Sequence, residues 1–208
     1  MKLIKAFIIL MSTVQVAFAC NECNANLWTI DGMLGMTQFE DVNNHDGQTA
    51  VGRLALGHGL LTERFGKIGL EAGIQSGHSM RLLFPKESID ALGGVPIEAN
   101  LNPMLDVLLS FKTNSVDAFP LFAWLKGGVI YRKMQIDRPS VNDVYDFAPE
   151  LQAGLGYKIN ERTSVNLGYQ YIWGSKPSLV VNEIAETGIL CHLPSQQSLM
   201  LGFSFNFG

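Results

Sequence analysis

The chain has 208 residues, of which 47% are hydrophobic, only 16% are charged and 21 are glycine. This composition excludes a disordered chain, a coiled coil and a basic nucleic-acid-binding protein. A formal net charge of −4 also argues against a nucleic-acid partner, which basic side chains would have to hold through its phosphates. A glycine-rich globular protein or a membrane β-protein remains.

The start of the chain, residues 1–19, is typical of a secretory signal peptide. Lys2 and Lys5 give it a positive beginning, an apolar stretch follows, and Ala17-Phe18-Ala19 forms a small-x-small cleavage site. The apolar stretch is shorter than the ~20 residues that a transmembrane helix needs. We therefore expect an exported protein in which residues 20–208 form one domain.

Two cysteines, Cys20 and Cys23, follow the expected cleavage site and could form a small disulfide after export. A redox-active Cys-x-x-Cys motif would need a βαβ context, which the neighbouring sequence does not provide. Lipidation of Cys20 is the alternative, although Phe18 is bulky for a lipobox. Cys191 lies far along the chain without an assignable partner, and the histidines are scattered. We therefore predict no metal site and no cofactor.

After this leader, apolar and polar residues alternate with a period of two, which indicates β-strands and excludes helices. At positions 199–207, the odd-numbered residues are all apolar, whereas the even-numbered ones are polar or glycine except for Met200. Four segments alternate this clearly and four more do so weakly. In chain order, the eight predicted strands are 27–36, 50–61, 67–75, 103–112, 120–133, 150–159, 164–173 and 198–207.

The connections between these segments alternate in length. Short ones follow the second, fourth and sixth strands, at 62–66, 113–119 and 160–163. Long ones follow the odd-numbered strands, at 37–49, 77–102, 134–147 and 174–197. This layout is typical of a bacterial outer-membrane barrel. The predicted fold class is all-β: an eight-stranded antiparallel up-and-down transmembrane β-barrel with short periplasmic turns and long extracellular loops.

Alternation alone does not say whether the apolar face contacts lipid or lines a cavity, as it does in a soluble periplasmic lipocalin-like barrel. The polar face is rich in glycine, which suits a narrow lumen. Aromatic residues also gather near strand ends on the apolar face, where membrane barrels carry interfacial girdles. The predicted girdle consists of Tyr157, Tyr169, Tyr171, Trp173 and Phe207. Both features favour the membrane barrel.

The strand pattern, the stretch 165–171 (VNLGYQY) and the Phe-rich end resemble the small eight-stranded outer-membrane proteins of the OmpA/OmpX/opacity type. Phe203, Phe205 and Phe207 resemble the C-terminal insertion signal of that group, although Gly208 follows the last aromatic residue. The resemblance implies a monomer in the bacterial outer membrane, in contact with lipid and lipopolysaccharide. It also implies a surface-antigen, adhesin or structural role, with a host or envelope protein bound through the loops.

The lumen of an eight-stranded barrel is just wide enough to be filled by side chains, so charged residues on the polar faces must pair there. The predicted lumen charge network comprises Asp31, Arg53, Glu71, Asp106, Lys126, Glu150 and Lys158. Three further basic residues, Lys67, Lys112 and Arg132, share the polar faces. We interpret the network as a structural plug; an ion gate whose pairs exchange partners is the alternative.

Two other features could carry function. Ser76 and His78, with Glu71 below them, could form the nucleophilic site of a lipid A-modifying acyl hydrolase or transferase. We expect no enzyme, because such loop pairs are usually only solvated polar residues. In the longest loop, Leu82, Leu83 and Phe84 form an apolar tip that either binds a partner or folds onto the barrel mouth.

Overall fold

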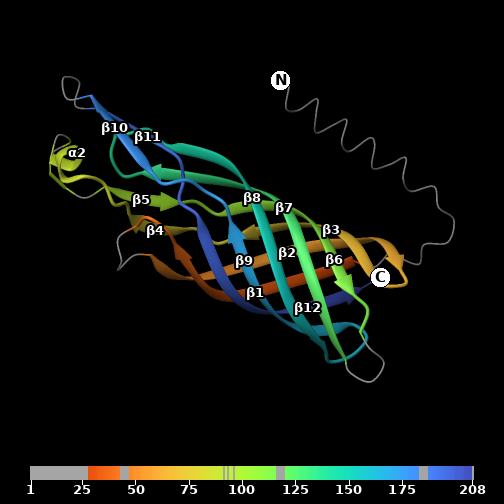
Figure 1. The fold of residues 1–208 in the computed structure, drawn as a ribbon. Coiled ribbons are helices and arrows are strands. Elements are labelled where there is room, and N and C mark those ends of the chain that lie inside the picture. Colours follow the sequence, from red (N-terminus) through yellow and green to blue (C-terminus); the bar gives the residue numbers. More distant parts are fainter. Residues whose placement is uncertain are drawn as a thin grey trace, which may run out of the picture.

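The computed structural model describes residues 28–42, 47–90, 92, 94–95, 97–115, 120–182 and 187–207. The expected signal peptide and the Cys20–Cys23 disulfide lie outside the described residues, and both stay predictions. Eight long strands wind around a common interior, and several shorter elements extend the molecule at one end (Figure 1).

Each long strand overlaps one predicted segment. The strands are β1 (Trp28–Phe39), β2 (Gln48–Glu63), β3 (Gly66–Gln75), β6 (Met104–Thr113), β7 (Leu121–Ile136), β8 (Val144–Lys158), β9 (Thr163–Ile172) and β12 (Gln196–Phe207). The shorter elements occupy two of the predicted loops. They are β4 (His78–Arg81), α2 (Lys86–Asp90) and β5 (Glu98–Leu101) in one, and β10 (Ser178–Asn182) and β11 (Thr187–Cys191) in the other.

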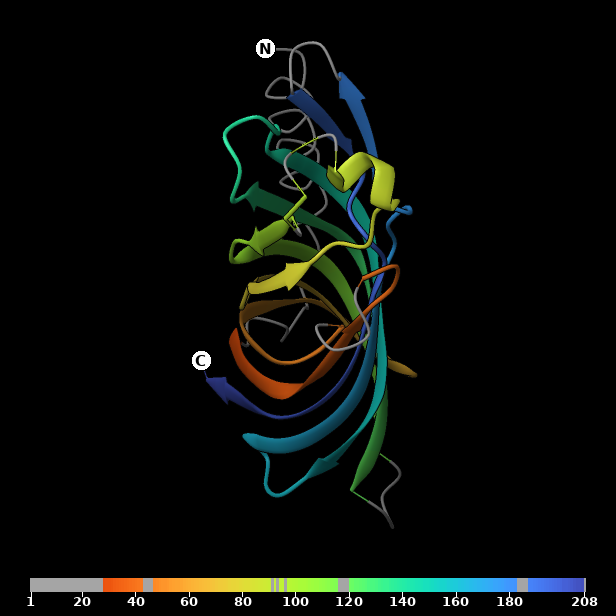
Figure 2. The same cartoon turned by 90° about the vertical axis from the view of Figure 1, so that its left-hand side faces the viewer.

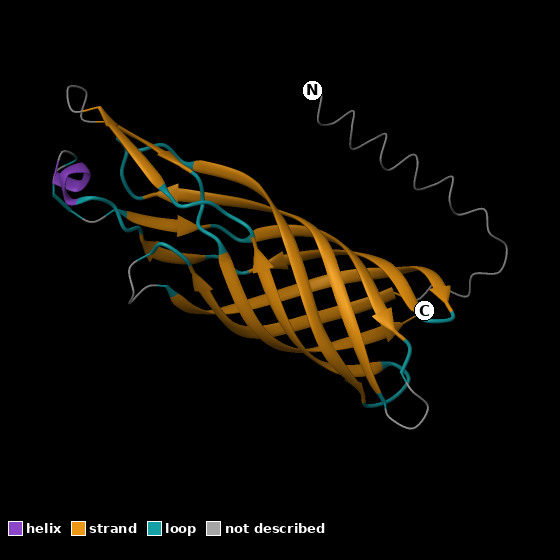
Figure 3. Ribbon diagram, in the orientation of Figure 1, coloured by secondary structure: helices purple, strands orange, loops and turns teal. Residues whose placement is uncertain are grey.

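The sheet closes on itself in the order β8-β9-β12-β1-β2-β3-β6-β7, with β7 paired back to β8. The first and last strands pair antiparallel along their whole length, from Trp28 opposite Phe207 to Phe39 opposite Gln196. Closure leaves the wall without a free edge, as a hydrocarbon environment requires. The predicted fold class is therefore confirmed. The strands run obliquely to the barrel axis and curve around one interior (Figures 2 and 3).

The apolar face of the barrel points outward. In β12, Leu201 and Phe203 are 56% and 59% exposed, whereas Ser204 on the opposite face is 1% exposed. A lipocalin-like barrel would bury its apolar face around a ligand, so this arrangement excludes that alternative. In the described part of the chain, no helix has the length and apolar character needed to cross a membrane.

The wall is taller at the end that carries the long connections, which we call the loop end, than at the opposite turn end. β5 continues the sheet there by pairing with the end of β7, and β4 pairs with β5. β8 begins at Val144 rather than at residue 150, because it continues past the end of β9 with β7 as its strand partner. Pro149, which cannot donate a backbone hydrogen bond, is tolerated where this pairing with β9 ends.

Candidate functional site: the filled lumen and the loop end

A chain of ion pairs crosses the middle of the lumen. Arg53 on β2 donates two hydrogen bonds to the Asp106 carboxylate on β6, from Nε to Oδ2 at 2.9 Å and from Nη2 to Oδ1 at 2.6 Å. Its Nη1 lies 2.7 Å from Glu71 Oε1 on β3. This fork uses the planar geometry of the guanidinium group, which a lysine could not reproduce.

Lys126 on β7 continues the chain toward β1. Its ammonium group lies 2.7 Å from Asp31 Oδ2 and 2.8 Å from Glu71 Oε2, and the residue is almost completely buried. Asp31 Oδ1 also accepts a hydrogen bond from Ser204 Oγ at 3.1 Å. Five strands, β1, β2, β3, β6 and β7, are thus tied together across the lumen, and Ser204 adds β12.

Two members of the predicted network lie outside this chain. Glu150 is buried, but its carboxylate accepts hydrogen bonds from the amides of Gln152 and Gln170, both at 2.6 Å. Lys158 does not join the network, because it ends β8 at the turn end, where its side chain is exposed and donates to Ser115 Oγ at 2.8 Å.

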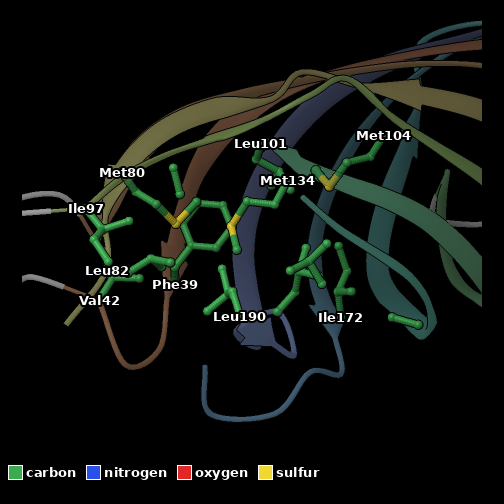
Figure 4. Close-up of a cluster of buried hydrophobic side chains, with 14 of the residues drawn as sticks. Phe39, Val42, Met80, Leu82, Ile97, Leu101, Met104, Met134, Ile172 and Leu190 are labelled. Carbon is green, nitrogen blue, oxygen red and sulfur yellow. The ribbon is translucent and has the colours of Figure 1, made fainter. Parts of the chain in front are cut away.

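An apolar cluster fills the interior on the loop-end side of the ion pairs. It is built from lumen-facing positions near the strand ends and from residues of the long connections (Figure 4). The buried members are Phe39, Val42, Met80, Leu82, Phe84, Ile97, Ala99, Leu101, Met104, Ile130, Met134, Val141, Val144, Ala148, Ile172, Leu190 and Leu193. Sequence reasoning missed this cluster, although Ile172, an apolar residue on a polar face, was one signal of it.

Arg132 on β7 makes hydrogen bonds on the inner side of the loop-end wall, at the level where β8 continues beyond the end of β9. Its guanidinium group donates to Asp146 Oδ2 at 2.8 Å and to two backbone carbonyls, Pro194 O at 2.8 Å and Trp173 O at 3.1 Å. A recess of about 300 Å³ lies in the wall beside these residues. The side chain thereby takes the place of the missing strand-to-strand hydrogen bonds.

We expect Arg132→Met to loosen this part of the wall without opening the barrel below it. Both carbonyls and Asp146 would lose a charged donor, at about 1.5–3 kcal/mol for each hydrogen bond made by a charged group. Hydrogen exchange should therefore rise in residues 144–149 and 173–175 and stay unchanged in β1. Arg162→Met, at an exposed turn-end position, is the control. Equal exchange in Arg132→Met and wild type would contradict this role.

The comparisons with known proteins show the fold. No family model and no curated protein matches the chain. It resembles the outer membrane protein OprG from Pseudomonas aeruginosa, with a TM-score of 0.55 and 12% identity over 89% of this chain and 97% of that one. Ail, the attachment invasion locus protein of Yersinia pestis, matches with a TM-score of 0.49 and 12% identity, over 88% of this chain and 99% of that one. The outer membrane protease OmpT from Escherichia coli matches with a TM-score of 0.46 and 10% identity, over 91% of this chain and 100% of that one.

The chain is a small outer-membrane β-barrel. The outward apolar face and the closed sheet put it in the bacterial outer membrane, where barrels of this kind reside. The resemblance inferred from the sequence is thus confirmed at the level of the fold. A shared fold does not by itself choose a function.

The predicted girdle residues lie on the outer surface of the barrel. Tyr157, Tyr169, Trp173 and Phe207 are exposed, and Tyr171 packs edge-to-face against Trp173 with ring centres 5.0 Å apart. Phe203 and Phe205 lie on the same face of β12, where Phe205 stacks on Phe207. Contact of these rings with lipid headgroups, and recognition of the last strand during insertion, stay predictions.

The structure does not assemble the hydrolase constellation. Ser76 Oγ accepts a hydrogen bond from the backbone N–H of Gly52 at 3.0 Å, and His78 Nδ1 lies 3.1 Å from Thr49 Oγ1. Glu71 is held by Lys126 and Arg53. The three groups therefore have separate partners and do not form a relay.

The apolar tip of the longest loop divides. Leu82 and Phe84 are 4% and 9% exposed and belong to the apolar cluster, whereas Leu83 is 62% exposed. For Leu82 and Phe84 the interpretation as an exposed tip is wrong; they fold onto the barrel mouth, because alternate residues of an extended segment point to opposite sides.

Proposed function

We propose that this barrel is a surface protein that binds a host or envelope protein through its loop end, with a lumen that serves as a structural plug. The proposal rests on the contrast between the interior of the barrel and its loop end. The middle of the lumen and its loop-end side are filled by paired charges and apolar side chains, while the loop end displays apolar residues to solvent.

The β10–β11 hairpin is the proposed contact surface. Val180 and Ile189 stand directly opposite each other in its register and are 62% and 60% exposed. The hairpin projects at the loop end, near α2 (Figure 1). Neighbouring exposed apolar side chains on a projecting two-stranded ribbon suit contact with a protein surface. Leu83 adds a third exposed apolar side chain on another connection of the same end.

Replacement of both hairpin residues, Val180→Ser with Ile189→Ser, tests this surface. Since both side chains are exposed, folding should be unaffected while attachment of expressing cells to a host surface or matrix falls at least several-fold. The matched control is Phe65→Ser, which removes an exposed apolar side chain at the turn end. Unchanged attachment of the double variant, at equal surface expression, would count against the hairpin and leave the structural role in the envelope.

The plug is tested separately by conductance. Purified barrel in a planar bilayer should show no steady nanosiemens-scale current, because the ion-pair chain and the apolar cluster occupy the lumen in series. Arg53→Ala should raise the frequency of brief openings by loosening the two carboxylates that it holds. A steady open level in the wild type would contradict the plug and favour the ion gate.

A further inference from the structure

A buried polar group of four residues lies beside the ion-pair chain in the lumen and is separate from it. It comprises Gln75, Glu150, Gln152 and Gln170, all 2% exposed or less. On the loop-end side it meets the apolar cluster, because Ile172 stands opposite Glu150 in the β8–β9 register and Met104 opposite Gln75 in the β3–β6 register. Figure 4 shows Met104 and Ile172 in that cluster.

The hydrogen bonds within this group leave three side-chain oxygens without a donor. Gln152 Nε2 and Gln170 Nε2 both donate to Glu150 Oε1 at 2.6 Å, and Gln170 Nε2 also donates to Gln75 Oε1 at 2.8 Å. These donors fix both amide orientations, since a reversed amide would direct its carbonyl oxygen at the carboxylate. Glu150 Oε2, Gln152 Oε1 and Gln170 Oε1 are left without a donor among the described residues, and Gln75 Nε2 is left without an acceptor.

The charges around Glu150 are already engaged. Arg53 on β2 is held by Asp106 and Glu71, and Arg132 on β7 by Asp146. Asp106 on β6 carries the same charge as Glu150 and repels it.

No described basic group approaches Glu150 within 4.0 Å, the distance of an ion pair. The ion-pair chain itself has three carboxylates and only two basic groups. Half-buried Lys112 attracts Asp31 and Glu71 from the turn end and so supplies the positive charge that the chain lacks. Arg53 and Arg132 attract Glu150 only from beyond contact distance. Glu150 is therefore the buried lumen carboxylate that has no ion pair of its own, and a buried charge in that position is strongly unfavourable.

We propose that Glu150, together with the side-chain oxygens of Gln152 and Gln170, binds a hard cation such as Ca²⁺ or Na⁺ inside the barrel. Gln152 and Gln170 are directly opposite each other on β8 and β9, and Glu150 shares the lumen face of β8 with Gln152. Carboxylate and amide oxygens are the ligands these cations prefer, and water completes their shell. The cation supplies the missing positive charge and partners for the three oxygens.

This site departs from the expectation of no metal. In the described ranges, no group of three His, Cys, Asp or Glu side chains is placed to hold a metal ion. The proposed site has one carboxylate and two amide oxygens as its protein ligands. It is therefore not recognised by a group of three such side chains. Its strongest signal is within the four-residue group, where three buried oxygens and only one buried nitrogen, Gln75 Nε2, have no partner among the described residues.

The test measures thermal unfolding of chelator-treated, detergent-folded barrel against added CaCl₂, NaCl or choline chloride, at neutral and at acidic pH. We expect the midpoint to rise saturably by several degrees with Ca²⁺ or with Na⁺, but not with choline. Glu150→Gln should abolish the rise, whereas Glu161→Gln, the same change at an exposed turn-end residue, should retain it.

Three results would overturn the site. The first is a wild-type midpoint that depends on pH but not on the cation, because Glu150 would then be neutralised by a proton. The second is a cation response retained in Glu150→Gln, and the third is one lost equally in Glu161→Gln. If Glu150→Gln does not fold, equilibrium dialysis of the wild type against radioactive Ca²⁺ and Na⁺ decides: one retained ion per barrel supports the site, and none retained contradicts it.

Discussion

Lys126→Met should destabilise the barrel by about 3–5 kcal/mol, because it leaves the buried carboxylates of Asp31 and Glu71 without their shared cation. The methionine keeps most of the side-chain volume, so the loss reports charge and not a cavity. The measurement is the free energy of unfolding from urea titration in lipid vesicles. Lys158→Met, at the exposed end of β8, should change it by less than about 1 kcal/mol.

A double variant tests whether the loss of stability comes from the carboxylates that Lys126 no longer pairs with. Asp31→Asn combined with Lys126→Met should recover part of the lost stability, because one of the two stranded charges is then removed. Equal stability of Lys126→Met and wild type would mean that the ion-pair chain does not hold the lumen together.

Gly168→Leu should lower the free energy of unfolding, because a side chain at this position would run into the indole ring of Trp124. Gly154 stands directly opposite Gly168 and meets the same ring, so the two glycines form the space that the ring fills. Overpacking of a well-filled interior typically costs about 1–3 kcal/mol, and a clash with an immobile indole lies at the upper end of that range.

The reverse change provides the control. Trp124→Ala alone should cost about 3–5 kcal/mol by leaving a cavity, and Gly168→Leu in the same chain should restore part of that loss by filling it. Unfolding free energies of the four variants form one double-mutant cycle. Additive effects would contradict the packing of Trp124 on Gly168.

The strands and their outward face could be predicted because each lipid-facing row, such as Leu199 to Phe207, must be apolar at every second position. The charged lumen residues followed from the same alternation. Their pairing did not, because the shear of the barrel sets which strands meet across the lumen. Arg53 therefore pairs with Asp106, separated from it in sequence by 53 positions.

The loop end could not be predicted by the same means. Its interior is apolar, so the alternation that marks the membrane-spanning part disappears there and Leu82 looks like a surface residue. The short strands β4 and β5 are stabilised by the extended β7 and not by local sequence preference. The start of β8 lies before the predicted segment, because this part of the strand pairs with β7 alone. It also contains Pro149, and a proline usually argues against a strand.

Electrophoresis of the outer-membrane fraction on a denaturing gel, with unboiled and boiled samples side by side, tests whether the protein is a closed barrel with its apolar face in the membrane. We predict that the protein lies in that fraction and that the unboiled form migrates differently from the boiled form, because the closed sheet resists the detergent until it is heated. Identical migration, with the protein soluble in the periplasm, would mean that the protein is not a closed membrane barrel.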